Sequence, residues 1–178
     1  HDEHTLDAVV EAAREGLVKP VLVGDEAKIR EILEELKFDP ANAEIINIPD
    51  PEEASVKTAA LAKAGEIDCI MKGHIETGPL LKVMVNRETG IRKSDTMSLV
   101  GFIDSPYYHK VFGITDVGLL TYPTLEQKKA AIENATAAFH ALGIENPKVA
   151  VLAAVEKVNP KMPETVEAAE LKRMNQEG

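Results

Sequence analysis

The stretch Pro20-Val21-Leu22-Val23-Gly24-Asp25 decides the fold class, because it reads as a short apolar strand that ends in glycine and leads directly into a helix. Asp25 is suited to cap that helix, which is predicted to run to Leu36 with Ile29 and Leu33 on one face. A short strand of this uniformly apolar kind is typical of a parallel sheet covered by helices on both faces.

The same alternation continues on both sides of this stretch. Apolar residues at helical spacing predict helices over 5–16 and 51–64, the second capped by Asp50 with Pro51 at its first position. Apolar runs predict strands over 44–48 and 67–71. Helices and strands in alternation, with short connections, indicate right-handed crossovers and an α/β fold with a mostly parallel sheet.

The second half of the chain changes character after the polar, turn-prone residues 86–95, where we expect a boundary between two lobes. Apolar runs over 97–103 and 109–114 lie close together and predict an antiparallel hairpin. A capping box of Thr124 and Gln127 begins the strongest helical pattern, which Gly143 ends. A strand over 149–155 and a helix over 162–175 follow.

Composition narrows the class of partner. The net charge is −10, which argues against nucleic acid and anionic membranes. No run of about 18 apolar residues is present to span a membrane. The single cysteine, Cys69, has no disulfide partner within the chain and lies in a predicted strand, so we expect a buried, inert thiol in a cytoplasmic protein. The chain begins at His1 rather than Met and ends after a helical pattern, and we expect both ends to be cut from a longer protein.

The loop Met71-Lys72-Gly73-His74-Ile75-Glu76-Thr77-Gly78-Pro79 is the most informative candidate site, because ligands of parallel sheets bind beyond the carboxyl ends of strands. Gly73 allows a ligand close to the backbone, and Thr77 is placed to cap the following helix, whose free N–H groups attract anions. Donors or positive charge are supplied nearby by Lys72, His74 and Lys82. The loop is either a phosphate or acyl-phosphate pocket or a capped turn with solvated lysines.

A second candidate is the pair Thr115-Asp116, which follows an apolar run. Asp116 can orient a ligand or act as a base, but on residue type alone a turn that binds its own backbone is favoured. Glu156 and Lys157 are better explained as a charged strand end. The nucleotide-binding and serine-hydrolase glycine motifs are absent, and one cysteine makes a zinc site implausible, whereas a scattered Mg²⁺ carboxylate site stays open.

Several motifs together resemble the phosphate acetyl/butyryltransferase family over nearly the whole chain. They include Ile114-Thr115-Asp116, Tyr122-Pro123-Thr124-Leu125-Glu126-Gln127-Lys128 and Ile132-Glu133-Asn134-Ala135. The segment 153–162, Ala-Ala-Val-Glu-Lys-Val-Asn-Pro-Lys-Met, is closer to the phosphate butyryltransferase branch. The resemblance implies a three-layer α/β/α fold of the isocitrate/isopropylmalate dehydrogenase kind, with two lobes and a cleft between them. Residues 1–88 would be the first lobe, lacking its first strand and its carboxyl-terminal part, and residues 89–178 a partial second lobe.

The resemblance also implies the reaction acyl-CoA + phosphate ⇌ acyl phosphate + CoA, with butyryl as the favoured acyl group. Coenzyme A is then a substrate, no metal or other cofactor is needed, and the enzyme is a cytoplasmic homodimer. Three alternatives stay open: a phosphate acetyltransferase, a non-catalytic fragment that binds CoA or acyl phosphate, and a dehydrogenase of the same superfold. Binding of NAD rather than CoA would favour the last.

By the same resemblance, the substrate-binding residues are Gly73, Thr77, Lys82, Ser98 and Asp116. Lys82 stands where the acetyl branch carries an arginine, which keeps the charge but loses the bidentate fork. Relatives often have Ser-His where this chain has Ser98-Leu99. The Ser-Arg pair and the aspartate expected to activate the thiol would lie beyond Gly178, so the catalytic residues stay unassigned and the isolated chain is expected to be inactive.

Overall fold

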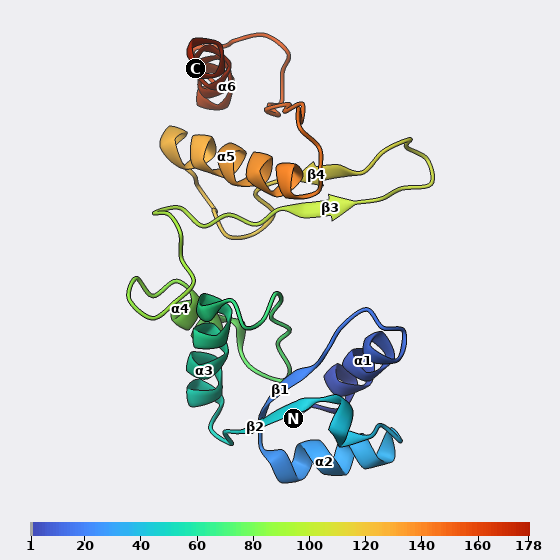
Figure 1. The fold of residues 1–178 in the computed structure, drawn as a ribbon. Coiled ribbons are helices and arrows are strands. Elements are labelled where there is room, and N and C mark those ends of the chain that lie inside the picture. Colours follow the sequence, from blue (N-terminus) through green and yellow to red (C-terminus); the bar gives the residue numbers. More distant parts are fainter. Residues whose placement is uncertain (1) are drawn as a thin grey trace. The chain divides into compact units, whose positions relative to one another are not determined.

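The computed structural model describes residues 2–178 and divides them into two compact units (Figure 1). The first unit ends at Lys93, and the second is Ser94–Gly178. The division falls within the polar residues 86–95, slightly beyond residue 88. Each unit has its own sheet and helices and is described by itself.

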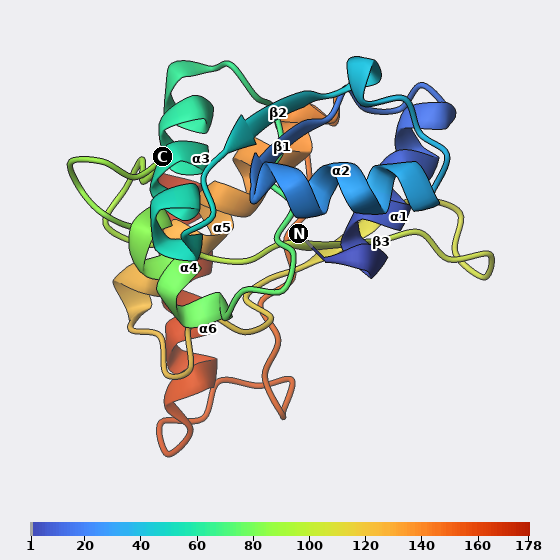
Figure 2. The same ribbon diagram turned by 90° about the horizontal axis from the view of Figure 1, so that it is seen from below.

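The first unit contains a parallel pair of strands, β1 (Val21–Gly24) and β2 (Glu44–Asn47). Val21 lies opposite Glu44, and Gly24 lies opposite Asn47. Figures 1 and 2 show α2 lying along this pair, and α2 contacts both strands. The helical elements are α1 (Glu3–Arg14), α2 (Glu26–Glu35), the short 3₁₀ helix η1 (Pro40–Asn42), α3 (Pro51–Ala64) and α4 (Thr77–Met84).

Aspartate side chains begin the first three helices. Asp25 accepts hydrogen bonds from the N–H groups of Ala27 and Lys28, and Asp50 does the same for α3, whose first residue is Pro51. Asp2 caps α1 through the N–H of Thr5. Such caps satisfy N–H groups that the helix itself cannot pair. The caps predicted at Asp25 and Asp50 are confirmed.

The core of the first unit gathers around four buried side chains, Val10, Ile29, Leu33 and Phe38. Leu22 of β1 and Ile45 of β2 pack against them. The core therefore joins α1 and α2 to the parallel strands. Because burying one aliphatic side chain of this size contributes about 1.5–3 kcal/mol, this cluster is the main stabilising feature of the unit.

The second unit is built on an antiparallel hairpin, β3 (Gly101–Ile103) and β4 (Phe112–Ile114), as the sequence predicted. Figure 1 shows α5 (Leu125–Ala141) beside the hairpin. Phe102 meets Phe139 of α5 edge-on, with ring centroids 5.1 Å apart. A Cβ atom at Gly113 would lie 2.7 Å from the ring of Phe139, so a residue without a side chain is needed for α5 to pack this closely.

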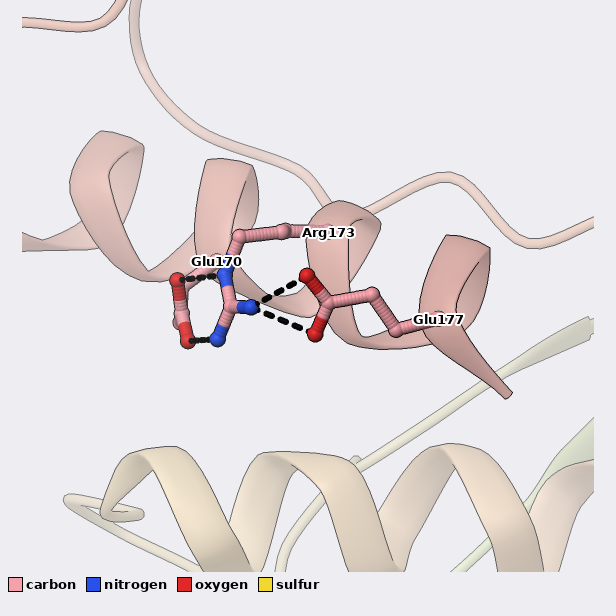
Figure 3. A network of polar contacts seen from close by, with 3 residues as sticks. All are labelled: Glu170, Arg173 and Glu177. Atoms are coloured by element: carbon pink, nitrogen blue, oxygen red, sulfur yellow. Dashed lines mark hydrogen bonds and ion pairs between the residues drawn. The ribbon is translucent and has the colours of Figure 1, made fainter.

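The predicted capping box at Thr124 and Gln127 is present at the start of α5. Lys128 of α5 forms an ion pair with Glu167 of α6 (Pro163–Glu177). On α6 itself, Arg173 lies between Glu170 and Glu177 (Figure 3), with its Nε 2.9 Å from Oε2 of Glu170. The hydrogen bond between Arg173 and Glu170 raises the pKa of the arginine and lowers that of the glutamate. Because all three side chains reach solvent, the network adds little to the stability of the helix.

Two predicted strands do not form, and two are shorter than predicted. Residues 67–71 and 149–155 adopt no regular strand, whereas 97–103 and 109–114 shorten to β3 and β4. An apolar run becomes a strand only beside another strand that completes its hydrogen bonds. In the described part of the chain, β1 pairs with β2 and β3 pairs with β4, so the runs 67–71 and 149–155 have no partner strand. Leu152, in the second of these runs, is 87% exposed. The mixed α/β class is confirmed, and among residues 2–178 the parallel pair is β1–β2.

Cys69 is exposed, so the prediction of a buried thiol is wrong. The reason is the same, because the strand expected to bury it does not form. Among residues 2–178, no helix is long and apolar enough to cross a membrane.

Candidate functional site

The loop before α4 forms one side of a hollow of about 360 Å³. Its walls are Asp2 and the run from Lys72 to Glu76. Gly73 faces the amino-terminal end of α1, where an added Cβ would lie 3.6 Å from Cβ of Asp2 and 3.8 Å from Oγ1 of Thr5. These are ordinary contact distances, so a Cβ atom would fit at this position without a clash. Its absence leaves the wall of the hollow more open.

Charge in this hollow is mixed rather than positive. Hydrogen bonds from the hydroxyl and then the N–H of Thr5 hold the pKa of Asp2 below its ordinary value, with smaller contributions from His4 and His74. Glu76 adds a second carboxylate. Lys72 directs its ammonium to the carbonyl oxygen of Ile75, 3.1 Å away. The lysine therefore fixes the shape of the loop, and the hollow lacks the excess of positive charge expected of a phosphate pocket.

Thr77 does not cap α4, contrary to the prediction. It is the first helical residue, and the N-cap position belongs to Glu76, whose side chain makes no capping hydrogen bond. The backbone of Glu76 is extended, and glutamate is not among the side chains favoured as caps. At the amino-terminal end of α4, no cap side chain therefore accepts hydrogen bonds from the first N–H groups. These N–H groups lie at the positive end of the helix dipole.

Lys82 is exposed and lies in the last turn of α4, not near its first turn. Five residues separate it from Thr77, which corresponds to about 7.5 Å along the helix axis. Thr77 and Lys82 both lie outside the walls of the hollow. The structure therefore brings Gly73, Lys72 and His74 together and leaves Thr77 and Lys82 on the helix that follows.

In the second unit, both carboxylate oxygens of Asp116 accept backbone hydrogen bonds. Oδ1 accepts from Gly118 and Leu119, each at 2.7 Å, and from Leu120 at 3.2 Å. Oδ2 accepts from Leu99 at 2.8 Å. Burial raises the pKa of this carboxyl group, but the four N–H donors together outweigh burial and leave the pKa below its ordinary value. The turn favoured on residue type is confirmed: an ionised Asp116 organises its own loop.

Ser98 is half-buried and receives a hydrogen bond from a residue that the candidate set did not include. The side-chain nitrogen of Asn134 on α5 lies 3.0 Å from Oγ of Ser98 and 3.2 Å from the carbonyl oxygen of Thr96. A signal was available in the sequence, because Asn134 is a polar residue on the helix face that also carries Ala131 and Ala135, both of which are buried.

Next to Asp116, the hydroxyl of Thr115 is buried, and the described residues provide no hydrogen-bond partner for it. An unpaired buried hydroxyl is uncommon in folded proteins and is normally satisfied by water or a ligand. Glu156 and Lys157 are exposed on an irregular segment, consistent with a solvated role.

Comparisons with known proteins agree on one family. A family model described as phosphate acetyl/butaryl transferase matches residues 51–178. The phosphate acetyltransferase of Thermotoga maritima is 44% identical over 178 residues, which are 100% of this chain and 60% of that protein. The phosphate butyryltransferase of Clostridium acetobutylicum is 39% identical over 177 residues, 99% of this chain and 59% of that protein. The chain thus spans about three fifths of the length of these relatives.

A solved structure shows a similar fold. It is that of a branched-chain phosphotransacylase from Enterococcus faecalis V583, with a TM-score of 0.70 and 24% sequence identity. The similarity covers 88% of this chain and 63% of that one. At this identity, the likeness concerns the fold alone.

Proposed function

Since the chain belongs to the phosphate acetyl/butaryl transferase family, we propose that the natural protein interconverts acyl-CoA and phosphate with acyl phosphate and CoA. The observation that carries the proposal is the family match over residues 51–178, which include α4, the Asp116 loop and α5. Relatives at 44% and 39% identity along essentially the whole chain support it.

The chemistry is a direct acyl transfer between two bound substrates. The CoA thiolate attacks the carbonyl carbon of the acyl phosphate, a C–S bond forms, and the C–O bond to the phosphoryl group breaks. The thiol proton passes to a base, and phosphate leaves with the bonding electron pair. Such a reaction requires hydrogen-bond donors for the phosphoryl oxygens and for the developing oxyanion, and close positioning of the two substrates.

Each unit holds its own candidate for phosphoryl binding, the start of α4 in the first unit and Ser98 in the second. The amino-terminal end of α4 provides N–H groups without a side-chain cap, and Gly73 keeps the preceding loop open. Lys82 contributes positive charge from the last turn of the same helix. The mixed charge of the hollow beside Asp2 makes the helix end, rather than the hollow, the better place for an anion.

For the acyl group, we propose butyryl, with acetyl as the alternative. The segment 153–162 favours butyryl, whereas relatives named for acetyl and for butyryl transfer match at 44% and 39% identity. A difference of two methylene groups in a pocket is worth only about 1–3 kcal/mol per group.

Three further features belong to the proposal. The natural protein acts as a cytoplasmic homodimer, uses CoA as a substrate, and employs no metal or redox cofactor. Its fold is the three-layer α/β/α fold of isocitrate and isopropylmalate dehydrogenases. The parallel β1–β2 pair and the similarity to the Enterococcus faecalis structure support this fold.

Calorimetric titration of the natural protein tests the proposal. We expect CoA and butyryl phosphate each to bind, and binding of NAD with Mg²⁺ to be undetectable under the same conditions. Binding of NAD without binding of CoA would replace the acyltransferase assignment with a dehydrogenase of the same superfold.

A further inference from the structure

The segment from Thr96 to Leu99 is held from two directions although it has no regular secondary structure. From α5, the side-chain nitrogen of Asn134 donates to the carbonyl oxygen of Thr96 and to Oγ of Ser98. From the loop after β4, Asp116 accepts the N–H of Leu99 at 2.8 Å. Ser98 therefore lies between two anchored neighbours, with its own hydroxyl in contact with α5.

The register of the hairpin explains this arrangement. Gly101 of β3 lies opposite Ile114 of β4, and continuing the same register outward brings Leu99 opposite Asp116. The Asp116 carboxylate thus extends the pairing past the end of the strands. Both Ser98 and Phe102 contact α5, Ser98 through Asn134 and Phe102 through Phe139.

The direction of the hydrogen bond between Asn134 and Ser98 follows from the second hydrogen bond of Asn134, to Thr96. A backbone carbonyl oxygen can only accept, so the group of Asn134 that faces Thr96 must be the amide nitrogen. The same nitrogen reaches Ser98, and its two hydrogens match its two acceptors. Oγ of Ser98 is therefore an acceptor toward α5, and its own proton remains to be donated to another group.

We propose that Asn134 and Asp116 are positioning residues that hold the Ser98 hydroxyl as a hydrogen-bond donor to a phosphoryl oxygen of the substrate. The inference rests on the proposed acyl transfer and adds to it. It gives Asp116 a different task from the substrate contact expected from the sequence, because both of its oxygens are engaged by four backbone N–H groups. It also adds Asn134, which acts only through Ser98.

A double-mutant cycle on the natural protein tests the inference. We expect Ser98→Ala to raise the KM for phosphate about tenfold, the loss of one hydrogen bond to a charged group, with the KM for CoA unchanged. Asn134→Ala should raise the phosphate KM by about threefold to tenfold in the wild-type background and by less than about twofold in the Ser98→Ala background. The control is Glu133→Gln, an exposed neighbour on α5, which should change neither value.

Two results would overturn the inference: effects of Ser98→Ala and Asn134→Ala that multiply in the double variant, or a phosphate KM that Ser98→Ala leaves unchanged. Thermal unfolding of each variant separates these results from a loss of folding. A titration with inorganic phosphate, followed through the amide resonance of Leu99, needs no turnover. Phosphate binding there without acyl transfer would refute the proposed reaction and keep the Ser98 assignment. Turnover without any response of the Leu99 amide to phosphate would refute the Ser98 assignment and keep the proposed reaction.

Discussion

Gly90 provides the sharpest test of the packing that positions α4. An added Cβ would lie 2.4 Å from the carbonyl oxygen of Met84, 2.6 Å from that of Val83 and 2.7 Å from that of Asn86. All three are backbone atoms in the last turn of α4 or just after it, so no side chain can rotate away. The N–H of Gly90 also donates to Asn86 at 3.1 Å. The glycine thus closes a tight turn that fastens the helix end.

We expect Gly90→Ala to lower the free energy of unfolding of the first unit by about 2–4 kcal/mol. Overpacking a well-packed site typically costs about 1–3 kcal/mol, and three backbone contacts in place of one argue for the upper part of that range and slightly beyond. Gly78 is the matched control, because it lies in α4 itself and an added Cβ there meets nothing within 4 Å. Gly78→Ala should be neutral or stabilising by up to about 1 kcal/mol, since alanine has the higher helix propensity.

Urea unfolding followed by far-ultraviolet circular dichroism measures both variants, and amide hydrogen exchange assigns the loss to α4. The three tyrosines, Tyr107, Tyr108 and Tyr122, lie in the second unit, so near-ultraviolet signals report on that unit separately. A Gly90→Ala variant as stable as the wild type, with normal protection in α4, would refute the packing described for this turn.

Three further predictions concern the core, the Asp116 loop and the proposed phosphate site. Leu33→Ala should destabilise the first unit by about 2–5 kcal/mol in urea unfolding, because Leu33 is 0% exposed, whereas Leu152→Ala at an exposed position should change stability by less than about 0.5 kcal/mol. The lowered pKa of Asp116 stabilises the second unit above the ordinary carboxyl pKa, so this contribution should be lost as the pH falls below about 4. Asp116→Asn should be less stable than the wild type at pH 7, with a difference that shrinks on acidification; an unchanged difference contradicts the assignment. Lys82→Ala in the natural protein should raise the KM for phosphate about tenfold, and Lys57→Ala, an exposed lysine on α3, should not; equal effects would remove Lys82 from the site.

Local signals in the sequence were sufficient where the deciding interactions are local. The caps at Asp25, Asp50 and Thr124 involve residues within three positions of one another, and all three are present. The antiparallel hairpin was predictable because its strands are close in the chain. In each case, the pattern contains both partners of the interaction.

Signals failed where the partner is distant or absent from the pattern. The apolar run that contains Cys69 looks like a strand, but a strand needs a neighbour that its own sequence cannot specify. Thr77 was assigned as a cap because threonine favours that position, yet the helix begins one residue earlier than a Thr77 cap requires. Asn134 was missed as a site residue because its partners, Thr96 and Ser98, lie on a different element.

The contacts around two charged residues define structural tasks that residue type alone does not predict. Asp116 lies in a conspicuous loop, as expected, but its carboxylate serves the backbone around it. Lys72 likewise holds the carbonyl of Ile75 instead of presenting its charge to the hollow. Residue type indicates what a side chain can do, whereas the contacts around it determine which of those tasks it performs.

The most direct test of the proposed reaction is phosphorolysis of an acyl-CoA by the natural protein, followed by ³¹P NMR and by thiol release. The proposal predicts that acyl phosphate and free CoA appear in equal amounts, only when inorganic phosphate is present, with both acetyl-CoA and butyryl-CoA tested as donors. Release of CoA without acyl phosphate, or no release with either donor, would contradict it.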